Sequence, residues 1–174
     1  MHPPNPKVGL RPFLPDDTSA LADIFRESIA ELTGEDYSAG QQRAWASAAD
    51  EEEPFGHRLA RALTLVATLG GRPVGFASLA DGSRIAMLYV HPRAARQGVA
   101  TALLDALETL AAARGAKHLV VDASDTARDL FERRNYKVQR RNTVSSGREW
   151  LGNTTMEKAL APRRVDPPSN RGGP

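Results

Sequence analysis

Apolar positions recur with two different spacings along the chain, and the spacing predicts which segments are strands and which are helices. Residues 8–12 alternate and predict a short first strand. A helix is predicted to begin near Thr18, after helix-start residues, and to end at Gly34. A second helix is predicted over 38–48, with more helix towards Ala62. The first third of the chain is therefore mainly helical.

The middle of the chain changes to short apolar runs that are typical of strands. Residues 63–68 and 74–79 flank a pair of glycines and predict a hairpin. A third strand is predicted over 85–90. A long amphipathic helix then follows over 103–113, and Gly115 provides its C-terminal end.

The remaining segments predict a strand over 118–122, a helix over 126–134 and two strands near 136–144 and 149–158. This order predicts an α/β (α+β) fold with a mixed, mostly antiparallel sheet of about six to seven strands and about four helices. A doubly wound nucleotide fold or a barrel does not fit it. We expect one domain over residues 7–160, a flexible segment over 1–6 and a disordered tail over 161–174.

The segment between the strand at 85–90 and the long helix is basic and contains Gly98. A strand that turns through such a loop into a helix directs free backbone N–H groups at one point, and the helix dipole adds positive potential there. The loop is therefore predicted to bind a phosphate or pyrophosphate. Its sequence matches neither GxxxxGK[ST] nor GxGxxG.

The same segment resembles motif A of the GNAT N-acetyltransferase superfamily, V-x-P-x-x-[QR]-x-x-G-[VI]-[GA]. The resemblance implies the GNAT fold, with acetyl-CoA as co-substrate. It assigns the pantetheine-binding backbone to Leu88, Tyr89 and Val90. It assigns the pyrophosphate loop to Arg96, Gln97, Gly98, Val99, Ala100 and Thr101. Ala95 departs from the family, which usually has Gln or Arg at that position.

A second segment, 122–136, resembles motif B of the same family, N-x-x-A-x-x-L-Y-x-x-x-G-F. The resemblance implies that Ser124, Ala127 and Phe131 lie against the cofactor. Phe131 stands where many members have the tyrosine that is commonly assigned as the general acid. Because phenylalanine cannot donate a proton, that role is vacant or is filled by another residue. Asn135 replaces the glycine of the motif and tolerates a left-handed turn.

Transfer to an amine requires positioning, a route for the proton and hydrogen-bond donors for the oxyanion. Asp122 is our first hypothesis for the base, because it follows the strand beside the expected thioester; alternatively, it caps the following helix. Tyr89 and Tyr37 are the phenols that are candidates for the acid, and a packing role is the alternative for both. Ala86 stands where many relatives carry an acid on the central strand.

Candidate substrate-binding residues lie in the N-terminal helical part. Tyr37, Gln41 and Trp45 are spaced four residues apart, and Glu31 is the middle member of three glutamates at the same spacing. An aromatic wall beside carboxylates suits a cationic or aromatic amine. The alternative is that Trp45 belongs to the core and that the glutamates face solvent.

Charge is distributed unevenly along the chain, although the net charge is only +2. The first 53 residues carry eleven acids and four bases, a net charge of −7, so the rest carries +9. The acids at 50–53 either face a cationic amine or form a solvated turn. A basic cluster over 133–141 suits the 3′-phosphate of CoA, an RNA or a solvated face, and the low net charge disfavours nucleic acid.

Composition excludes several classes of chemistry. The chain has no cysteine, so disulfides and a thiol nucleophile are excluded and acetyl transfer is expected to be direct. Its four histidines lack the spacing of metal ligands, and we expect no metal. We find neither an apolar run long enough to span a membrane nor a signal-peptide pattern, and we expect a cytoplasmic protein. The oligomeric state is open, a homodimer included.

The sequence thus predicts an acetyl-CoA-dependent N-acetyltransferase that acts on a small amine. Two alternatives remain open at this stage. One is a non-catalytic module that binds acyl-CoA, which the phenylalanine at position 131 favours. The other is an acetyltransferase whose acceptor is a protein or an RNA.

Overall fold

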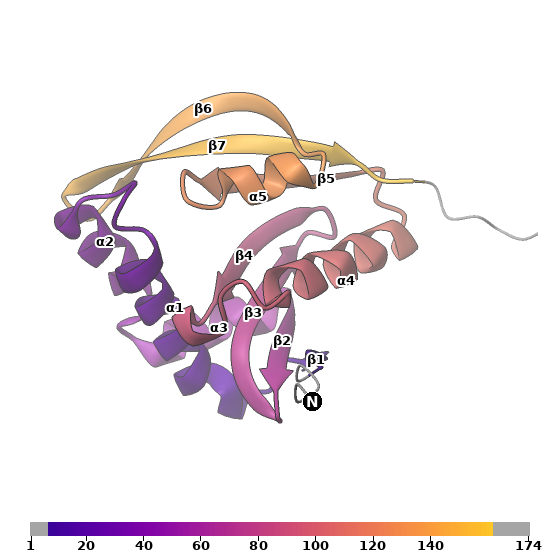
Figure 1. Ribbon diagram of the computed structural model, residues 1–174, viewed down its shortest axis with the longest axis horizontal. Helices are drawn as coiled ribbons and strands as arrows, with labels where there is room; N and C mark the ends of the chain where they lie inside the picture. The colour runs from indigo at the N-terminus through magenta and orange to yellow at the C-terminus, as the bar shows by residue number, and fades with distance from the viewer. Residues whose placement is uncertain (1–6, 162–174) are drawn as a thin grey trace, which may run out of the picture.

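A computed structural model describes residues 7–161 of the chain. The expectations for residues 1–6 and for almost all of the tail lie outside this range. Within residues 7–161, seven strands form one sheet (Figure 1), and only the β4–β5 pair is parallel. In spatial order the strands are β1 (Gly9–Pro12), β2 (Leu63–Leu69), β3 (Arg72–Ala80), β4 (Arg84–Val90), β5 (His118–Ser124), β7 (Glu149–Ala159) and β6 (Lys137–Ser146). The predicted mixed, mostly antiparallel sheet is confirmed.

Helices cover both faces of this sheet and divide the interior into two cores. The helices are α1 (Thr18–Leu32), α2 (Ala39–Ala46), α3 (Glu52–Arg61), α4 (Val99–Ala113) and α5 (Arg128–Arg133). One core contains Leu103, Leu104 and Leu107 of α4 together with Phe131 of α5. The other core joins α1 and α3 to the opposite face of the sheet. The fold is thus an α/β sandwich around one continuous sheet.

The part of the chain before β2 contains one more separate helix than the sequence order indicated. A short bend at residues 50–51 follows α2 and its 3-10 turn, and the helix predicted towards Ala62 begins afresh as α3. Glu52 and Glu53 occupy the first turn of α3 and are exposed. Carboxylates are favourable near a helix N-terminus because they complement the helix dipole. This placement agrees with the solvated interpretation of the acidic segment.

The sheet opens between its two central strands. β4 and β5 are paired only at Arg84–Val120 and Ile85–Val121, although β4 continues to Val90. After Ile85 the two strands separate, so this edge of β4 has no neighbouring strand. Backbone N–H and C=O groups that lose their ladder partner are available to a ligand. The separation creates the site described next.

Candidate active site

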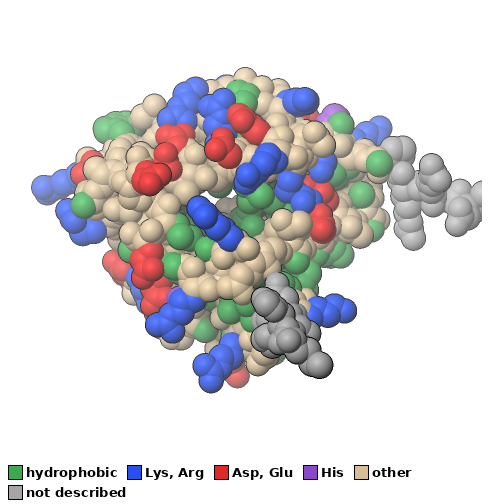
Figure 2. Space-filling view, viewed as in Figure 1, with side chains coloured by type: hydrophobic (Ala, Val, Ile, Leu, Met, Phe, Trp, Pro, Cys, Tyr) green, Lys and Arg blue, Asp and Glu red, His purple; other side chains and the backbone are tan. Residues whose placement is uncertain are grey.

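A pocket of about 470 Å³ lies in the gap between the separated strands. We call it the central pocket; its lining includes Leu32, Tyr37, Trp45, Leu88, Ser124 and Phe131. Its volume falls within the range of small-molecule sites in proteins. Figure 2 shows a hollow in the middle of the face that is seen in Figure 1, with apolar and basic side chains around it. The pocket brings residues of α1, α2, β4, β5 and α5 together.

The N-terminus of α4 lies at one end of this pocket and has unsatisfied backbone donors. Gly98 is the N-cap, with φ +81°, and no side chain caps the helix. Ala102 N–H donates to the Gly98 carbonyl, so the three preceding N–H groups have no partner within the helix. A Cβ at Gly98 would meet no atom within 4 Å, so the space beside this N-cap residue is open.

The predicted loop residues differ in their accessibility. Arg96, Gln97, Gly98 and Thr101 are exposed. In contrast, Val99 is buried in the core, and Ala100 lines the central pocket. Arg96 has φ +61°, and no described residue forms an ion pair with it. The loop therefore combines free donors with positive charge, as an anion site requires.

Among the described residues, the Tyr89 hydroxyl accepts a hydrogen bond but donates none. Trp45 Nε1 donates a hydrogen bond of 3.2 Å to this hydroxyl, and the described residues provide no acceptor for the phenolic hydrogen. Tyr89 also packs edge-on against Phe25, with ring centroids 4.6 Å apart. Burial raises the pKa of Tyr89 to about 12, while the bond from Trp45 lowers it. The phenol thus stays protonated at neutral pH.

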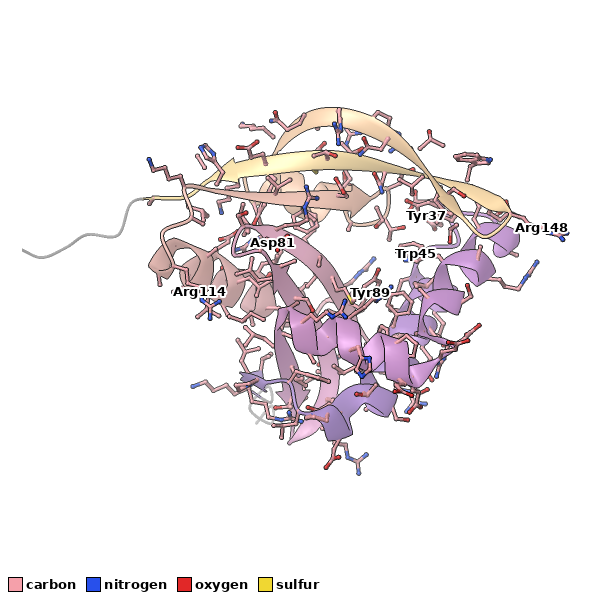
Figure 3. The ribbon with its side chains drawn as sticks, turned by 180° about the vertical axis from the view of Figure 1, so that it is seen from behind. Tyr37, Trp45, Asp81, Tyr89, Arg114 and Arg148 are labelled. Carbon is pink, nitrogen blue, oxygen red and sulfur yellow. The ribbon has the colours of Figure 1, made fainter. Side chains whose placement is uncertain are left out.

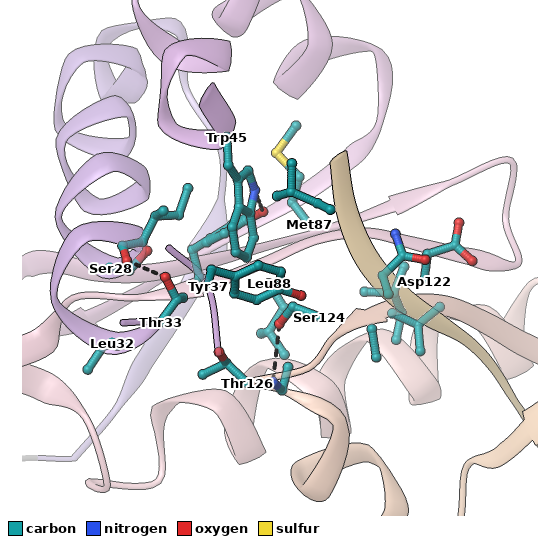
Figure 4. Close-up of a pocket in the computed structure, with 18 of the residues that line it drawn as sticks. Ser28, Leu32, Thr33, Tyr37, Trp45, Met87, Leu88, Asp122, Ser124 and Thr126 are labelled. Carbon is teal, nitrogen blue, oxygen red and sulfur yellow. Dashed lines mark hydrogen bonds between the residues drawn. The ribbon is translucent and has the colours of Figure 1, made fainter. Parts of the chain in front are cut away.

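Tyr37 is buried, and its hydroxyl is engaged on both sides. It donates to the Gly152 carbonyl over 2.7 Å and accepts from Asp125 N–H over 2.9 Å. Its ring packs edge-on against Trp45 (Figure 4), with centroids 5.3 Å apart. Burial raises the pKa of Tyr37. Tyr37 therefore fastens the α1–α2 connection to β7 and to the β5–α5 connection.

Asp122 lies on β5 and contributes to the pocket wall, but it is apart from Tyr37 and Trp45 (Figure 4). Its carboxylate accepts hydrogen bonds from Thr155 Oγ1 over 2.6 Å and from Arg84 over 3.2 Å. It caps no helix, so that alternative interpretation is wrong. No side chain caps α5; the Ser124 hydroxyl instead accepts from Ala127 N–H over 3.1 Å and so closes the turn that precedes this helix.

The segment that resembles motif B contributes three further residues to the lining of the central pocket. They are Ser124, Ala127 and Phe131. Phe131 is 1% exposed, and its ring packs edge-on against Tyr136, with centroids 5.1 Å apart. Asn135 has φ +70°, so the left-handed turn expected at this position is present.

Two residues of the proposed substrate face lie elsewhere. Glu31 is exposed and does not line the central pocket. Gln41 completes a capping box with Ser38 at the start of α2, and its side-chain amide donates to the Trp150 carbonyl over 2.7 Å. Tyr37 precedes α2, so the three residues do not share one helical face; Tyr37 and Trp45 do meet in the pocket.

The basic cluster is partly neutralised by acids. Arg134 pairs with Asp105 and Glu108, and Arg141 forms a two-pronged ion pair with Asp125. The pairing lowers the pKa of Asp125.

Sequence reasoning missed Asp125 and Gly152 as the partners of Tyr37. Contacts across 88 and 115 residues leave no local signal in the sequence.

No group of three or more His, Cys, Asp or Glu side chains within residues 7–161 is arranged to hold a metal ion. No helix in this range is long and apolar enough to cross a membrane.

Comparisons with known proteins identify the family. Residues 33–160 match the acetyltransferase (GNAT) domain family. The chain is 33% identical over 149 residues to a protein of Escherichia coli K12 named Uncharacterized N-acetyltransferase YafP, covering 86% of this chain and 94% of that protein. This chain therefore belongs to the GNAT acetyltransferase family, as the two motifs predicted.

Solved structures support the same assignment. One is a GCN5-related N-acetyltransferase from Rhodopseudomonas palustris, described also as an aminotransferase, class II. It is 55% identical, covers 92% of this chain and all of that chain, and gives a TM-score of 0.88. The PaiA N-acetyltransferase from Thermoplasma acidophilum, in complex with coenzyme A, is 18% identical. It covers 88% of this chain and 99% of that chain, with a TM-score of 0.73, and shows the shared fold.

Proposed function

We propose that this protein transfers the acetyl group of acetyl-CoA directly to the amine of a small molecule. The observation that carries the proposal is the separation of β4 from β5 in front of the uncapped N-terminus of α4. The unpaired strand edge suits the pantetheine amides, and the helix N-terminus suits the pyrophosphate. The coenzyme A complex of the PaiA relative supports the same ligand class.

In the proposed reaction the acceptor attacks as the neutral amine. A bond forms between its nitrogen and the carbonyl carbon of the thioester, and the negative charge moves to the carbonyl oxygen. Backbone N–H groups at the free edge of β4, near Leu88 and Val90, stabilise this oxyanion. The carbon–sulfur bond then breaks, and the excess proton of the amine passes to solvent water rather than to Asp122, whose carboxylate is already bonded.

Tyr89 supplies the proton for the leaving thiolate in this proposal, and the resulting phenolate regains a proton from solvent water before the next turnover. Its hydroxyl lies in the wall of the central pocket, accepts from Trp45 and keeps its own hydrogen available. Phe131 lacks a proton to donate, and the Tyr37 hydroxyl is committed to Gly152. Tyr89 is therefore better suited to this role than the other aromatic residues of the pocket.

The test is release of free CoA thiol from acetyl-CoA across a panel of amines at mildly alkaline pH. The chain has no cysteine, so the protein contributes no thiol background. Release that requires an amine supports the proposal and ranks the acceptors. Calorimetric binding of acetyl-CoA without release from any amine would contradict it and favour a binding module.

A further inference from the structure

A second cavity of about 560 Å³ lies between α3 and strands β3 and β4. We call it the α3 pocket. It shares four residues with the central pocket: Trp45, Ala86, Met87 and Tyr89. Figure 3 shows Tyr89 between Trp45 and Asp81, two residues of the α3-pocket lining. The two cavities therefore meet at the segment of β4 where the proposed reaction takes place.

The wall of the α3 pocket is aromatic and apolar near this junction. Phe25, Trp45, Met87 and Tyr89 all belong to it. Trp45 and Tyr89 are only partly buried, and their ring centroids lie 6.3 Å apart. Such walls suit a flat or apolar ligand body, and the volume is sufficient for a molecule with one ring.

Two arginines stand at the α3 side of the same cavity. Arg58 and Arg61 are three residues apart on the last turn of α3, so they project from the same face of the helix. Neither forms a hydrogen bond or an ion pair with a residue in the described range 7–161; Arg58 lies over the Phe55 ring, 5.7 Å from its centroid. Guanidinium groups bind carboxylates with two parallel hydrogen bonds.

The charged residues that line this cavity are mainly basic, whereas the acidic N-terminal part of the chain indicated a negatively charged substrate site. Its lining contains two arginines and one acid, Asp81. The positive charge of Arg58 also acts on Tyr89, where it lowers the pKa that burial raises. Arg58 and Tyr89 both belong to the lining of the α3 pocket, so the same cavity connects this charge with the junction of the two pockets.

From this arrangement we infer that the α3 pocket binds the acceptor, and that the acceptor is an amine with a carboxylate on an apolar body. Its carboxylate meets Arg58 and Arg61, its apolar part lies against Phe25 and Met87, and its amine points to Tyr89. This inference rests on the proposed function, because it assigns the acceptor of that reaction. The sequence pattern of aromatic residues beside glutamates suggested a cationic or aromatic amine; the α3 pocket adds a carboxylate to this description.

Two probes of matched shape test the inference. Para-(aminomethyl)benzoate carries an amine and a carboxylate at opposite ends of one ring, and benzylamine lacks the carboxylate. We expect the wild-type protein to have a higher kcat/KM for para-(aminomethyl)benzoate, hereafter the benzoate, than for benzylamine. In Arg58→Gln/Arg61→Gln protein, KM for the benzoate should rise about 10-fold to 100-fold, as expected for lost charge-assisted bonds. KM for benzylamine and for acetyl-CoA should stay unchanged.

Arg72→Gln is the control for loss of charge, because Arg72 is exposed on β3 and lines neither pocket. It should leave both KM values unchanged. Equal KM changes for benzoate and benzylamine in the double variant, or no preference for the benzoate in the wild type, would overturn the inference.

A binding measurement separates this inference from the proposed function. The chain has two tryptophans, and Trp150 is 63% exposed on β7, so Trp150→Phe leaves Trp45 as the single fluorescent reporter. Quenching of Trp45 by the benzoate that disappears in the arginine variant supports the site even without thiol release. Thiol release from other amines, without arginine-dependent quenching, supports the enzyme and refutes the site.

Discussion

The indole of Trp45 donates a hydrogen bond to the phenolic oxygen of Tyr89, which acts as the acceptor. The indole Nε1 donates over 3.2 Å, and the phenolic hydrogen has no acceptor among residues 7–161. The neighbouring phenol of Tyr37 is bonded on both sides. In the proposed reaction Tyr89 is therefore the phenol that is free to donate a proton, whereas both sides of the Tyr37 hydroxyl are bonded within the protein.

Tyr89→Phe should lower kcat by about a hundredfold or more, because general acid catalysis contributes factors of this size. KM for acetyl-CoA should change little, since the ring remains in place. Tyr37→Phe is the matched control and should keep kcat within about tenfold. Thiol-release kinetics of both variants provide the measurement. A larger kcat loss in Tyr37→Phe than in Tyr89→Phe would reverse the two assignments.

The pH dependence of kcat should lack a falling limb from Tyr89 in the neutral and mildly alkaline range. A general acid acts in its protonated form, so its activity is lost as pH rises through its pKa. Burial raises the pKa of Tyr89 to about 12, which places that loss at strongly alkaline pH. The profile should therefore rise as the acceptor amine is deprotonated and then level off. A decline at or below about pH 10, the ordinary tyrosine pKa, would contradict this assignment.

Gly98→Asp should abolish binding of acetyl-CoA, because it adds a negative charge at the N-cap of α4 that repels the pyrophosphate. Gly71→Asp is the matched control. Gly71 has φ +78°, close to the +81° of Gly98, and its Cβ position is also open, but it lies in the β2–β3 hairpin. Calorimetry should show loss of affinity only in the first variant. Equal affinity in both variants would refute the loop assignment.

Asp122→Asn should reduce kcat by less than about tenfold, a factor below the usual contribution of a general base. The carboxylate already accepts from Thr155 and Arg84, and an amide oxygen can retain the bond from Thr155. Steady-state kinetics at several pH values provide the measurement. A loss above a hundredfold that grows as pH falls would restore Asp122 as the base.

Asp17→Asn should remove a pH-dependent part of the stability. Hydrogen bonds from Arg11 lower the pKa of Asp17, and the two guanidinium–carboxylate contacts are each 2.7 Å long. A lowered pKa stabilises the fold above the unfolded-state value of about 3.9, and this contribution is lost as pH falls towards the folded-state pKa. Urea unfolding should show a stability difference from wild type at pH 7 that shrinks below pH 4. A constant difference would contradict the linkage.

Much of the fold was predictable from local patterns. Leu103, Leu104 and Leu107 recur at helical spacing, and they form the buried face of α4. The glycine-containing loop also followed from short-range chemistry, and the left-handed turn at Asn135 followed from the resemblance to motif B. These features depend on neighbours in the chain, which is why the sequence is sufficient for them.

Other features depend on packing between distant segments. Tyr37 was predicted as part of a helix face, but it contacts Gly152, which is 115 residues away. Asp122 precedes a helix in the sequence, but its register opposite Thr155 in β7 determines its bonds. The arginines of α3 became visible only once that helix was placed beside β4. Spacing within one segment cannot reveal such relationships.

The bonds of Tyr37 have one more consequence for the gap between β4 and β5. The strands are joined at one end by the pairs of Arg84 and Ile85, and Tyr37 links the helical half to Asp125 beyond the other end. The width of the gap is thus set from both ends by the protein itself. An incoming ligand need not hold two halves of the molecule together. Less of its interaction free energy is consumed in ordering the receptor, and more remains as affinity.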